Sequence, residues 1–442
     1  MRRTILVGML ATLSLSGCFL FPGQPPAPTP DPPQPPGPAP SPTLSRQVFV
    51  SGTALVNGIL SVNVRRAGTQ DRIAGATVSL VGPTPAWGVT DSALPMRFDP
   101  LEAGTYALRV SAPGHATRLV TGLSIDPKTP LETTVELTPQ AGTISGTVSG
   151  PGGPIEGARV AAGESWTFSG ADGGFTLEGL GAGAHTLSIR KALHAPSTRQ
   201  VALNGTDLAL GSVVLARQAT KPIVVFENDA QPFGATSVGT ALGALKSALG
   251  TDFTVSTSVS DAADVRVVAS PRAAFATDAT ASRLQDFVAS GGTLVLMGEW
   301  GGALDYSPEA LNRIARPFGL AFCPDLVRTT ANSAQPGWIK VAAPELPAPH
   351  AMPGGVTFYE ACSIFAPPTA RAIARAGDGG YRVAATLGGP AIAVAQPYAQ
   401  GLVLAIGDTS AWSTGYITGE PPGGGAPGQT NNLGFVLNLF KW

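Results

Sequence analysis

The residues best placed for chemistry are four carboxylates that closely follow predicted β-strands. Glu227 and Asp229 follow the strand 223–226, Glu299 follows 294–297 and Asp408 follows 402–406. In open α/β sheets, ligands bind beyond the carboxyl ends of the strands. Paired carboxylates there could act as acid and base in glycoside hydrolysis, or hold a hard cation such as Ca²⁺. The alternative is ordinary loop polarity, because aspartate favours turns.

If these carboxylates meet, their mutual repulsion must be relieved by protonation, by a basic side chain or by a cation. Calcium is the simplest relief, and its binding is then expected to raise the melting temperature by mass action. Trp300, next to Glu299, could add a flat apolar wall suited to a sugar face. Burial in the core is the alternative account of that tryptophan.

The amino-terminal residues predict an export signal and a lipid anchor. Arg2 and Arg3 precede an apolar stretch, 5–15, which is too short to span a membrane. It ends in Leu15-Ser16-Gly17-Cys18, which resembles the lipobox of bacterial lipoproteins. The resemblance implies cleavage before Cys18 and attachment there of acyl chains such as palmitate, which hold the protein on a membrane. Phe19, where inner-membrane lipoproteins of enterobacteria carry aspartate, favours the outer membrane in a Gram-negative cell. An ordinary secretory signal is the alternative.

Cys323 and Cys362 are the two cysteines that remain once Cys18 is lipidated. An exported protein lies in a compartment that permits oxidation. We therefore predict a disulfide between them, with two buried thiols as the alternative.

Composition divides the chain into five parts. The signal peptide is 1–17, and a proline-rich linker with the lipidated cysteine is 18–45. Between positions 22 and 42, twelve residues are proline, a composition that favours an extended spacer of about 65 Å. The remaining parts are two β-sandwich repeats, 46–139 and 140–217, and an α/β domain, 218–442.

An internal repeat supports the two sandwiches. Residues 73–78 (IAGATV) recur as 155–160 (IEGARV), and 101–104 (LEAG) recur as 180–183 (LGAG). Alternating runs follow each copy, which is typical of antiparallel sandwiches and places Leu108 and Val110 on one face. The second copy resembles the carboxypeptidase-regulatory-like (transthyretin-like) domain, through Gly157-Ala158-Arg159-Val160 and Asp172-Gly173-Gly174-Phe175. That family is mostly non-catalytic.

After residue 220 strands and helices alternate. We expect strands at 223–226, 265–268 and 294–297, and a terminal hairpin of 391–395 with 402–406. One helix carries apolar residues from Val238 to Leu249, the next is capped by Asp278 or Thr280, and others begin after Ser307 and at Asn432. This order implies a mostly parallel sheet with helices on both faces.

Residues 284–296 look like the helix, Gly-Gly and strand of class I glutamine-amidotransferase-like domains, which have a flavodoxin-like fold. Residues 401–410 and 431–439 are similar to the end of the non-catalytic branch of that superfamily. The resemblance places the nucleophile at Gly298, and the domain's one histidine, His350, lies in a proline-rich loop. Nucleophilic catalysis needs a thiol or hydroxyl beside a base, so amidotransferase activity is not expected.

The net charge is −1, and charged residues make up 13% of the chain, without a basic cluster. This excludes nucleic acid as a partner, since phosphate binding needs clustered lysine and arginine. The sequence predicts a lipid-anchored binding or structural protein of the bacterial envelope, with envelope proteins or glycans as partners and a pseudo-enzymatic α/β domain. An envelope glycan hydrolase that uses the four carboxylates is the alternative.

Overall fold

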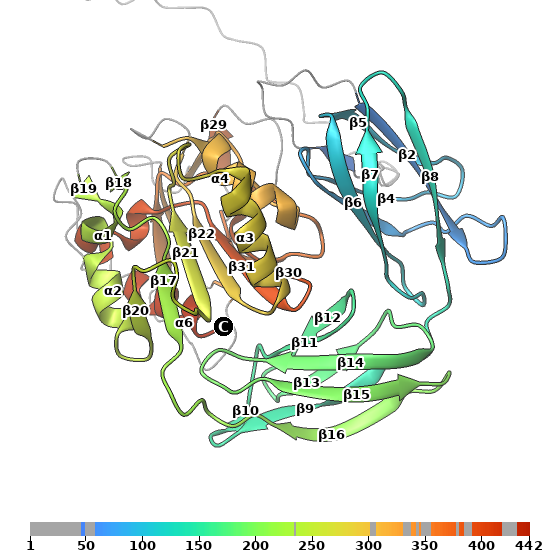
Figure 1. Ribbon diagram of the computed structural model, residues 1–442, viewed down its shortest axis with the longest axis horizontal. Coiled ribbons are helices and arrows are strands. Elements are labelled where there is room, and N and C mark those ends of the chain that lie inside the picture. Colours follow the sequence, from blue (N-terminus) through green and yellow to red (C-terminus); the bar gives the residue numbers. More distant parts are fainter. Residues whose placement is uncertain are drawn as a thin grey trace, which may run out of the picture. The chain divides into compact units, whose positions relative to one another are not determined.

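The structure is a computed structural model, which describes residues 46–48, 58–233, 236–300, 306–329, 337–341, 344–345, 355–376, 380–383, 391–417 and 431–442 (Figure 1). Cys18, the proline-rich linker and His350 lie outside this part of the chain. The described residues belong to one compact unit, Leu44–Trp442. Within that unit, no described helix is long and apolar enough to cross a membrane.

The first repeat forms two β-sheets around one core. One sheet has the order β1-β4-β3-β6-β7, with the strands β1 (Arg46–Val48), β3 (Thr77–Val81), β4 (Ala86–Val89), β6 (Gly104–Ser111) and β7 (Arg118–Ile125). The other has the order β5-β2-β8, with β2 (Gly58–Arg66), β5 (Met96–Leu101) and β8 (Leu131–Leu137). Leu108 and Val110 are fully buried while Arg109 between them is not, so the predicted alternation is confirmed.

The second repeat has the same arrangement. Its sheets are β12-β11-β14-β15 and β10-β9-β13, with β16 beside β9. The strands are β9 (Ile144–Gly150), β10 (Gly153–Pro154), β11 (Arg159–Ala162), β12 (Ser165–Phe168), β13 (Gly174–Leu177), β14 (Gly183–Arg190), β15 (Ser197–Leu203) and β16 (Leu208–Val214). In both repeats the last strand pairs in parallel with an early one, β8 with β2 and β16 with β9.

A buried hydroxyl marks the repeat at the atomic level. In the first copy, Thr90 Oγ1 accepts from the Ala76 amide (3.0 Å) and donates to the Ile73 carbonyl (2.6 Å). In the second, Ser169 Oγ makes the equivalent bonds to Ala158 and Ile155, at 2.9 and 2.7 Å. The glycine before each alanine, Gly75 and Gly157, has φ of 76° and 69°, a conformation that favours glycine. These shared bonds explain why the Gly-Ala motif recurs.

The C-terminal part is built on a seven-stranded sheet with the order β20-β17-β21-β22-β31-β30-β28. The first five strands are parallel, whereas β30 and β28 are antiparallel. The strands are β17 (Ile223–Phe226), β20 (Thr254–Ser256), β21 (Val265–Ala269), β22 (Thr293–Met297), β28 (Arg371–Arg375), β30 (Ala391–Tyr398) and β31 (Gly401–Ile406). Short antiparallel pairs accompany this sheet: β18 (Pro232–Phe233) with β19 (Thr236–Ser237), β23 (Ala321–Phe322) with β27 (Ile364–Phe365), β24 (Leu326–Thr329) with β29 (Gly380–Val383), and β25 (Trp338–Val341) with β26 (Val356–Tyr359).

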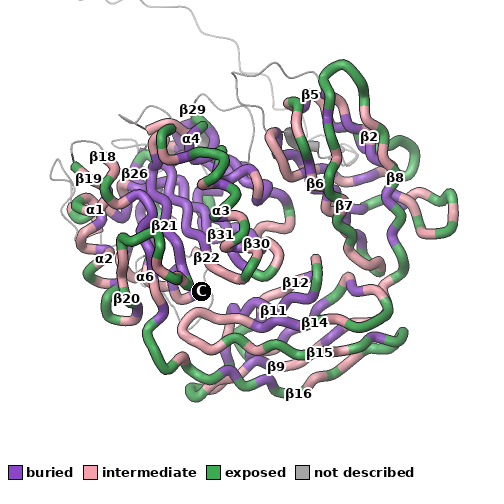
Figure 2. The backbone as a smooth tube through the Cα atoms, in the orientation of Figure 1, coloured by how far each residue is buried: buried purple, intermediate pink, exposed green. Residues whose placement is uncertain are grey.

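Helices cover both faces of this sheet, and its central strands are buried except at Thr293, the first residue of β22 (Figure 2). On one face pack α1 (Val238–Ala241), α2 (Gly243–Leu249) and α6 (Asn432–Phe440), and on the other α3 (Asp278–Ala289) and α4 (Pro308–Ala315). The remaining turns are η1 (Arg316–Phe318), η2 (Ser410–Trp412) and α5 (Thr414–Ile417).

Two details of the helices correct the sequence prediction. The N-cap of α3 is Thr277, whose hydroxyl accepts from the Thr280 amide, rather than Asp278 or Thr280. The helix predicted from Val238 onwards is divided at Leu242 into α1 and α2. Leu242 itself stays fully buried, so the predicted apolar face is kept although the helix is interrupted.

Candidate functional site

Two of the four predicted carboxylates meet at the carboxyl edge of the sheet. Strands β22 and β31 are parallel neighbours with Met297 opposite Ile406, so Glu299 and Asp408 leave the sheet at equivalent positions. They are 2% and 0% exposed. Glu299 Oε2 accepts from the amide and hydroxyl of Ser410, at 3.2 and 2.7 Å. Asp408 Oδ1 accepts from the Ala411 amide at 2.9 Å, and Oδ2 from the Tyr359 amide.

Burial dominates the electrostatics of this pair. It raises the pKa of Glu299 well above the usual carboxyl range, and the neighbouring Asp408 charge raises it further. Burial also raises the pKa of Asp408 to about 7, against the opposing effect of the backbone amides that it accepts from. Two carboxyls in one dry site cannot both ionise cheaply. The pair therefore holds its protons to a higher pH than exposed carboxyls do.

Glu227 and Asp229 are held elsewhere by basic side chains. The Glu227 side chain is fully buried and forms ion pairs with Arg266 and with Arg283, the latter at 2.6 Å. Asp229 pairs with Lys246 of α2 at 2.9 Å. Within the described residues, no group of three or more potential metal ligands gathers. The four carboxylates therefore do not form one cluster in the described residues, because arginine and lysine compensate two of them, and calcium binding stays a prediction.

The position that the resemblance assigned to a nucleophile is packed shut. Gly298 follows β22, and its amide donates to the Ile406 carbonyl at 2.7 Å. A Cβ atom built on Gly298 would lie 2.5 Å from the Phe322 ring and 3.1 Å from the Tyr306 hydroxyl oxygen. Phe322 is fully buried. A side chain at this position would therefore collide with the core.

We expect Gly298→Ala to lower the free energy of unfolding by about 2 kcal/mol, because overpacking displaces Phe322. Chemical denaturation measures the loss. Gly152→Ala is the matched control, since nothing lies within 4 Å of its added Cβ atom. Equal stability of the two variants would contradict the packing argument.

The predicted disulfide is not formed in the structure, where Cys323 and Cys362 are separate buried residues. The pairing of β23 with β27 places Cys323 opposite Ser363, whose carbonyl accepts the Cys323 amide at 2.9 Å. Cys362 is one residue further along, so its side chain points to the other face. Burial raises the pKa of the Cys362 thiol well above its usual value, which makes it a poor nucleophile.

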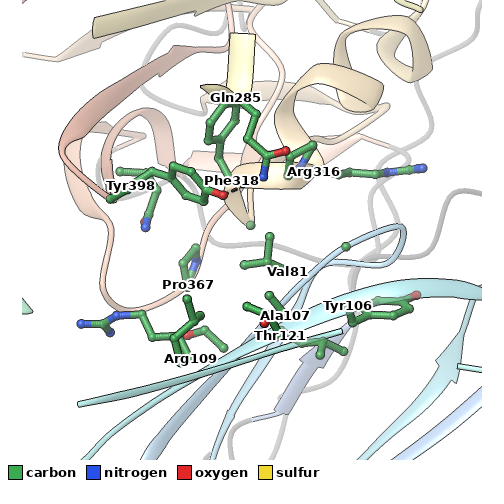
Figure 3. Close-up of a pocket in the computed structure, with 18 of the residues that line it drawn as sticks. Val81, Tyr106, Ala107, Arg109, Thr121, Gln285, Arg316, Phe318, Pro367 and Tyr398 are labelled. Carbon is green, nitrogen blue, oxygen red and sulfur yellow. Dashed lines mark hydrogen bonds between the residues drawn. The ribbon is translucent and has the colours of Figure 1, made fainter. Parts of the chain in front are cut away.

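A cavity of about 760 Å³ lies beside the first repeat (Figure 3). Val81, Tyr106 and Thr121 line it from the first repeat, and Phe318 and Tyr398 line it from the C-terminal part. The Phe318 and Tyr398 rings meet edge to face with centroids 5.1 Å apart. Its size and mixed lining suit a small molecule, and no sequence pattern pointed to it.

The comparisons with known proteins confirm one domain. Residues 143–216 match the model of the carboxypeptidase regulatory-like domain, as the sequence resemblance predicted for 140–217. A search of curated proteins finds no match.

Among solved structures, the chain is similar to the mmIFT52 N-terminal domain, with 18% identity and a TM-score of 0.37 over 50% of this chain and 96% of that one. It is also similar to GBS52, the minor pilin of Streptococcus agalactiae, with 11% identity and a TM-score of 0.19 over 37% of this chain and 97% of that one. A third similar structure is the shaft pilin spaA of Lactobacillus rhamnosus GG, with 8% identity and a TM-score of 0.17 over 40% of this chain and 100% of that one. These TM-scores are low, so the likenesses carry no argument about fold or function. Within this chain, the second β-sandwich, at residues 143–216, is similar to the carboxypeptidase regulatory-like domain.

Proposed function

We propose that this chain is a lipid-anchored, extracytoplasmic binding protein of the bacterial envelope. A proline-rich spacer would raise two β-sandwiches and an α/β domain that binds without turnover. We further propose that the α/β domain belongs to the non-catalytic class I glutamine-amidotransferase-like group. The succession of α3, Gly291-Gly292 and β22 supports this assignment, as does the mostly parallel sheet.

The observation that carries the proposal is the packing at Gly298. The place of a nucleophile is occupied by the Phe322 ring and the Tyr306 hydroxyl, so no reactive side chain fits there. The nearby carboxyl groups of Glu299 and Asp408 accept hydrogen bonds from Ser410, Ala411 and Tyr359. A domain that retains the edge of an enzyme's sheet but fills its catalytic position is suited to binding.

The raised carboxyl pKa values at Glu299 and Asp408 favour one second candidate, a glycan hydrolase with a protonated general acid. Incubating the purified protein with isolated sacculi separates the two functions. We expect the protein to sediment with the sacculi and to release no reducing ends. Release that disappears in Glu299→Gln would establish the hydrolase, and a failure to sediment would contradict binding to this glycan.

Replacing Cys18 with alanine is expected to release the protein from the membrane fraction. The reason is that the proposed anchor is the lipid attached to this cysteine. A protein that carries one acyl chain, or none, is held on a membrane only weakly. Detergent phase partitioning of cell fractions measures the change. Ser16→Thr, two residues before the modified position, is a control that keeps the cysteine. Retention of Cys18→Ala in the detergent phase would overturn the anchor.

A further inference from the structure

A second cavity, of about 260 Å³, lies where the second repeat meets the C-terminal part. Arg159, Arg190 and Lys191 line it from the second repeat. Gly291 and Trp442 line it from the C-terminal part. Three cationic side chains therefore share a small space.

Several hydrogen-bond donors at this cavity have no acceptor. Arg159 is 4% exposed, and its Nη2 donates to the Ala399 carbonyl, whereas its Nε and Nη1 have no partner among the described residues. The same holds for Arg190 Nε, Lys191 Nζ and Trp442 Nε1, all shielded from solvent. Buried donors are normally satisfied, and an unpaired one costs about 1–3 kcal/mol.

Carboxylates act on these charges without forming an ion pair in the described part of the chain: Glu164, Asp264 and Glu156 raise the pKa values of Arg159, Arg190 and Lys191, respectively, but burial lowers all three by more. None of the ion pairs between described residues includes Arg159, Arg190 or Lys191. Asp264 also lines the cavity, but its Oδ2 accepts the Ile223 amide at 2.9 Å. The other polar contacts use carbonyl oxygens: Arg190 Nη1 donates to Gly291 at 3.4 Å, and the Ala192 amide donates to Trp442 at 3.3 Å.

The pKa values show that these cations are destabilised as the structure stands. Burial, and then repulsion by Arg190, lowers the pKa of Arg159 to about 10. Burial lowers the pKa of Lys191 to about 8. Buried charges of one sign persist at low cost only when an opposite charge joins them.

We propose that this cavity binds a small oxyanion, a phosphate or sulfate group, whose oxygens accept from Arg159, Arg190 and Lys191. Guanidinium groups match such oxyanions through paired N–H donors, and ammonium adds a point charge. The volume suits the group itself or a small molecule that carries it. The anion would join the end of β14 to the Gly291 turn. This inference does not depend on the lipid anchor or on the proposed glycan binding.

Titration with inorganic phosphate and with sulfate, against chloride at constant ionic strength, tests the site in the whole soluble chain. We expect both anions to raise the melting temperature by a few degrees with saturation, as mass action requires. Isothermal titration calorimetry with phosphate should fit one binding site per chain. Lys191→Met should weaken phosphate binding about ten- to a hundredfold, because it removes one charge-assisted bond. In chloride it should melt no lower than the wild type, because a buried charge is gone.

Lys221→Met is the matched control, since Lys221 donates to the Gly250 carbonyl and does not line the cavity. It should bind phosphate as the wild type does. Glycerol phosphate and vesicles with phosphatidic acid then distinguish a lipid headgroup from the free anion. An unsaturable effect of phosphate, or equal affinity in the wild type and Lys191→Met, would overturn the site. If Lys191→Met fails to fold, Arg190→Met is measured in the same way.

Discussion

Replacing Arg266 with methionine is expected to lower the free energy of unfolding by about 3 kcal/mol. Arg266 lies in the buried strand β21, forms an ion pair with Glu227 and donates to the Asp261 carbonyl at 2.9 Å. Without it, Arg283, whose side chain is 43% exposed, is the one ion-pair partner that the described residues leave to the fully buried Glu227 carboxylate. A buried charge that loses its partner is costly, whereas the intact pair adds little. Chemical denaturation followed by circular dichroism measures the difference.

Arg313→Met is the control for loss of an arginine. Arg313 approaches Asp278 at 3.7 Å, and their side chains are 55% and 96% exposed. Such exposed pairs contribute about 0–1 kcal/mol, so this variant should stay near the wild type. Adding Glu227→Met to Arg266→Met should restore part of the stability, because no buried carboxylate is left uncompensated. If Arg266→Met and Arg313→Met lose the same free energy, the ion pair does not carry the effect.

The long elements could be predicted because each carries a complete local signal. Strand β17 lies at the predicted 223–226 and helix α6 at 432–440. The former is a continuous apolar run, and the latter begins at an asparagine cap. The pair of β23 with β27 spans two residues per strand, as does the pair of β18 with β19. So short a strand has no periodicity, and only its tertiary partner defines it.

The sequence predicts that part of the candidate site which depends on the register of neighbouring strands. Glu299 and Asp408 meet because parallel neighbours deliver equivalent positions to one edge. Glu227 also follows its strand, yet two arginines from other elements bind it. One feature of the sequence indicates that Glu227 is paired. Arg266 interrupts a run of buried valines, so its charge needs a buried counter-charge.

The cationic cavity could not be predicted from spacing. Arg159, Lys191 and Trp442 come from three separate segments, and each alone resembles an ordinary strand or terminal residue. The cysteine prediction failed for a related reason. Compartment and cysteine count permit a disulfide, but in the structure the two thiols are free and lie in different hydrophobic clusters.

The Glu299–Asp408 pair should make the folded state more stable in mild acid than in base. In the unfolded chain both carboxyls ionise near pH 4, whereas in the fold burial raises the pKa of Asp408 to about 7 and that of Glu299 well above its usual value. Between these values the folded state binds more protons than the unfolded state. The free energy of unfolding therefore falls as pH rises from about 4 to about 7 and beyond.

Glu299→Gln should flatten this dependence and raise the free energy of unfolding at pH 8 by about 2 kcal/mol. The glutamine keeps the shape, its carbonyl can accept from Ser410 as Oε2 does, and the charge next to Asp408 is removed. Denaturation curves at pH 5 and pH 8 measure the change, with Glu309→Gln as the control at a half-exposed carboxyl that pairs with Arg316. A Glu299→Gln variant that is less stable than the wild type at pH 8, with the same slope, would show that Glu299 is ionised in the fold and held by bonds to its charge.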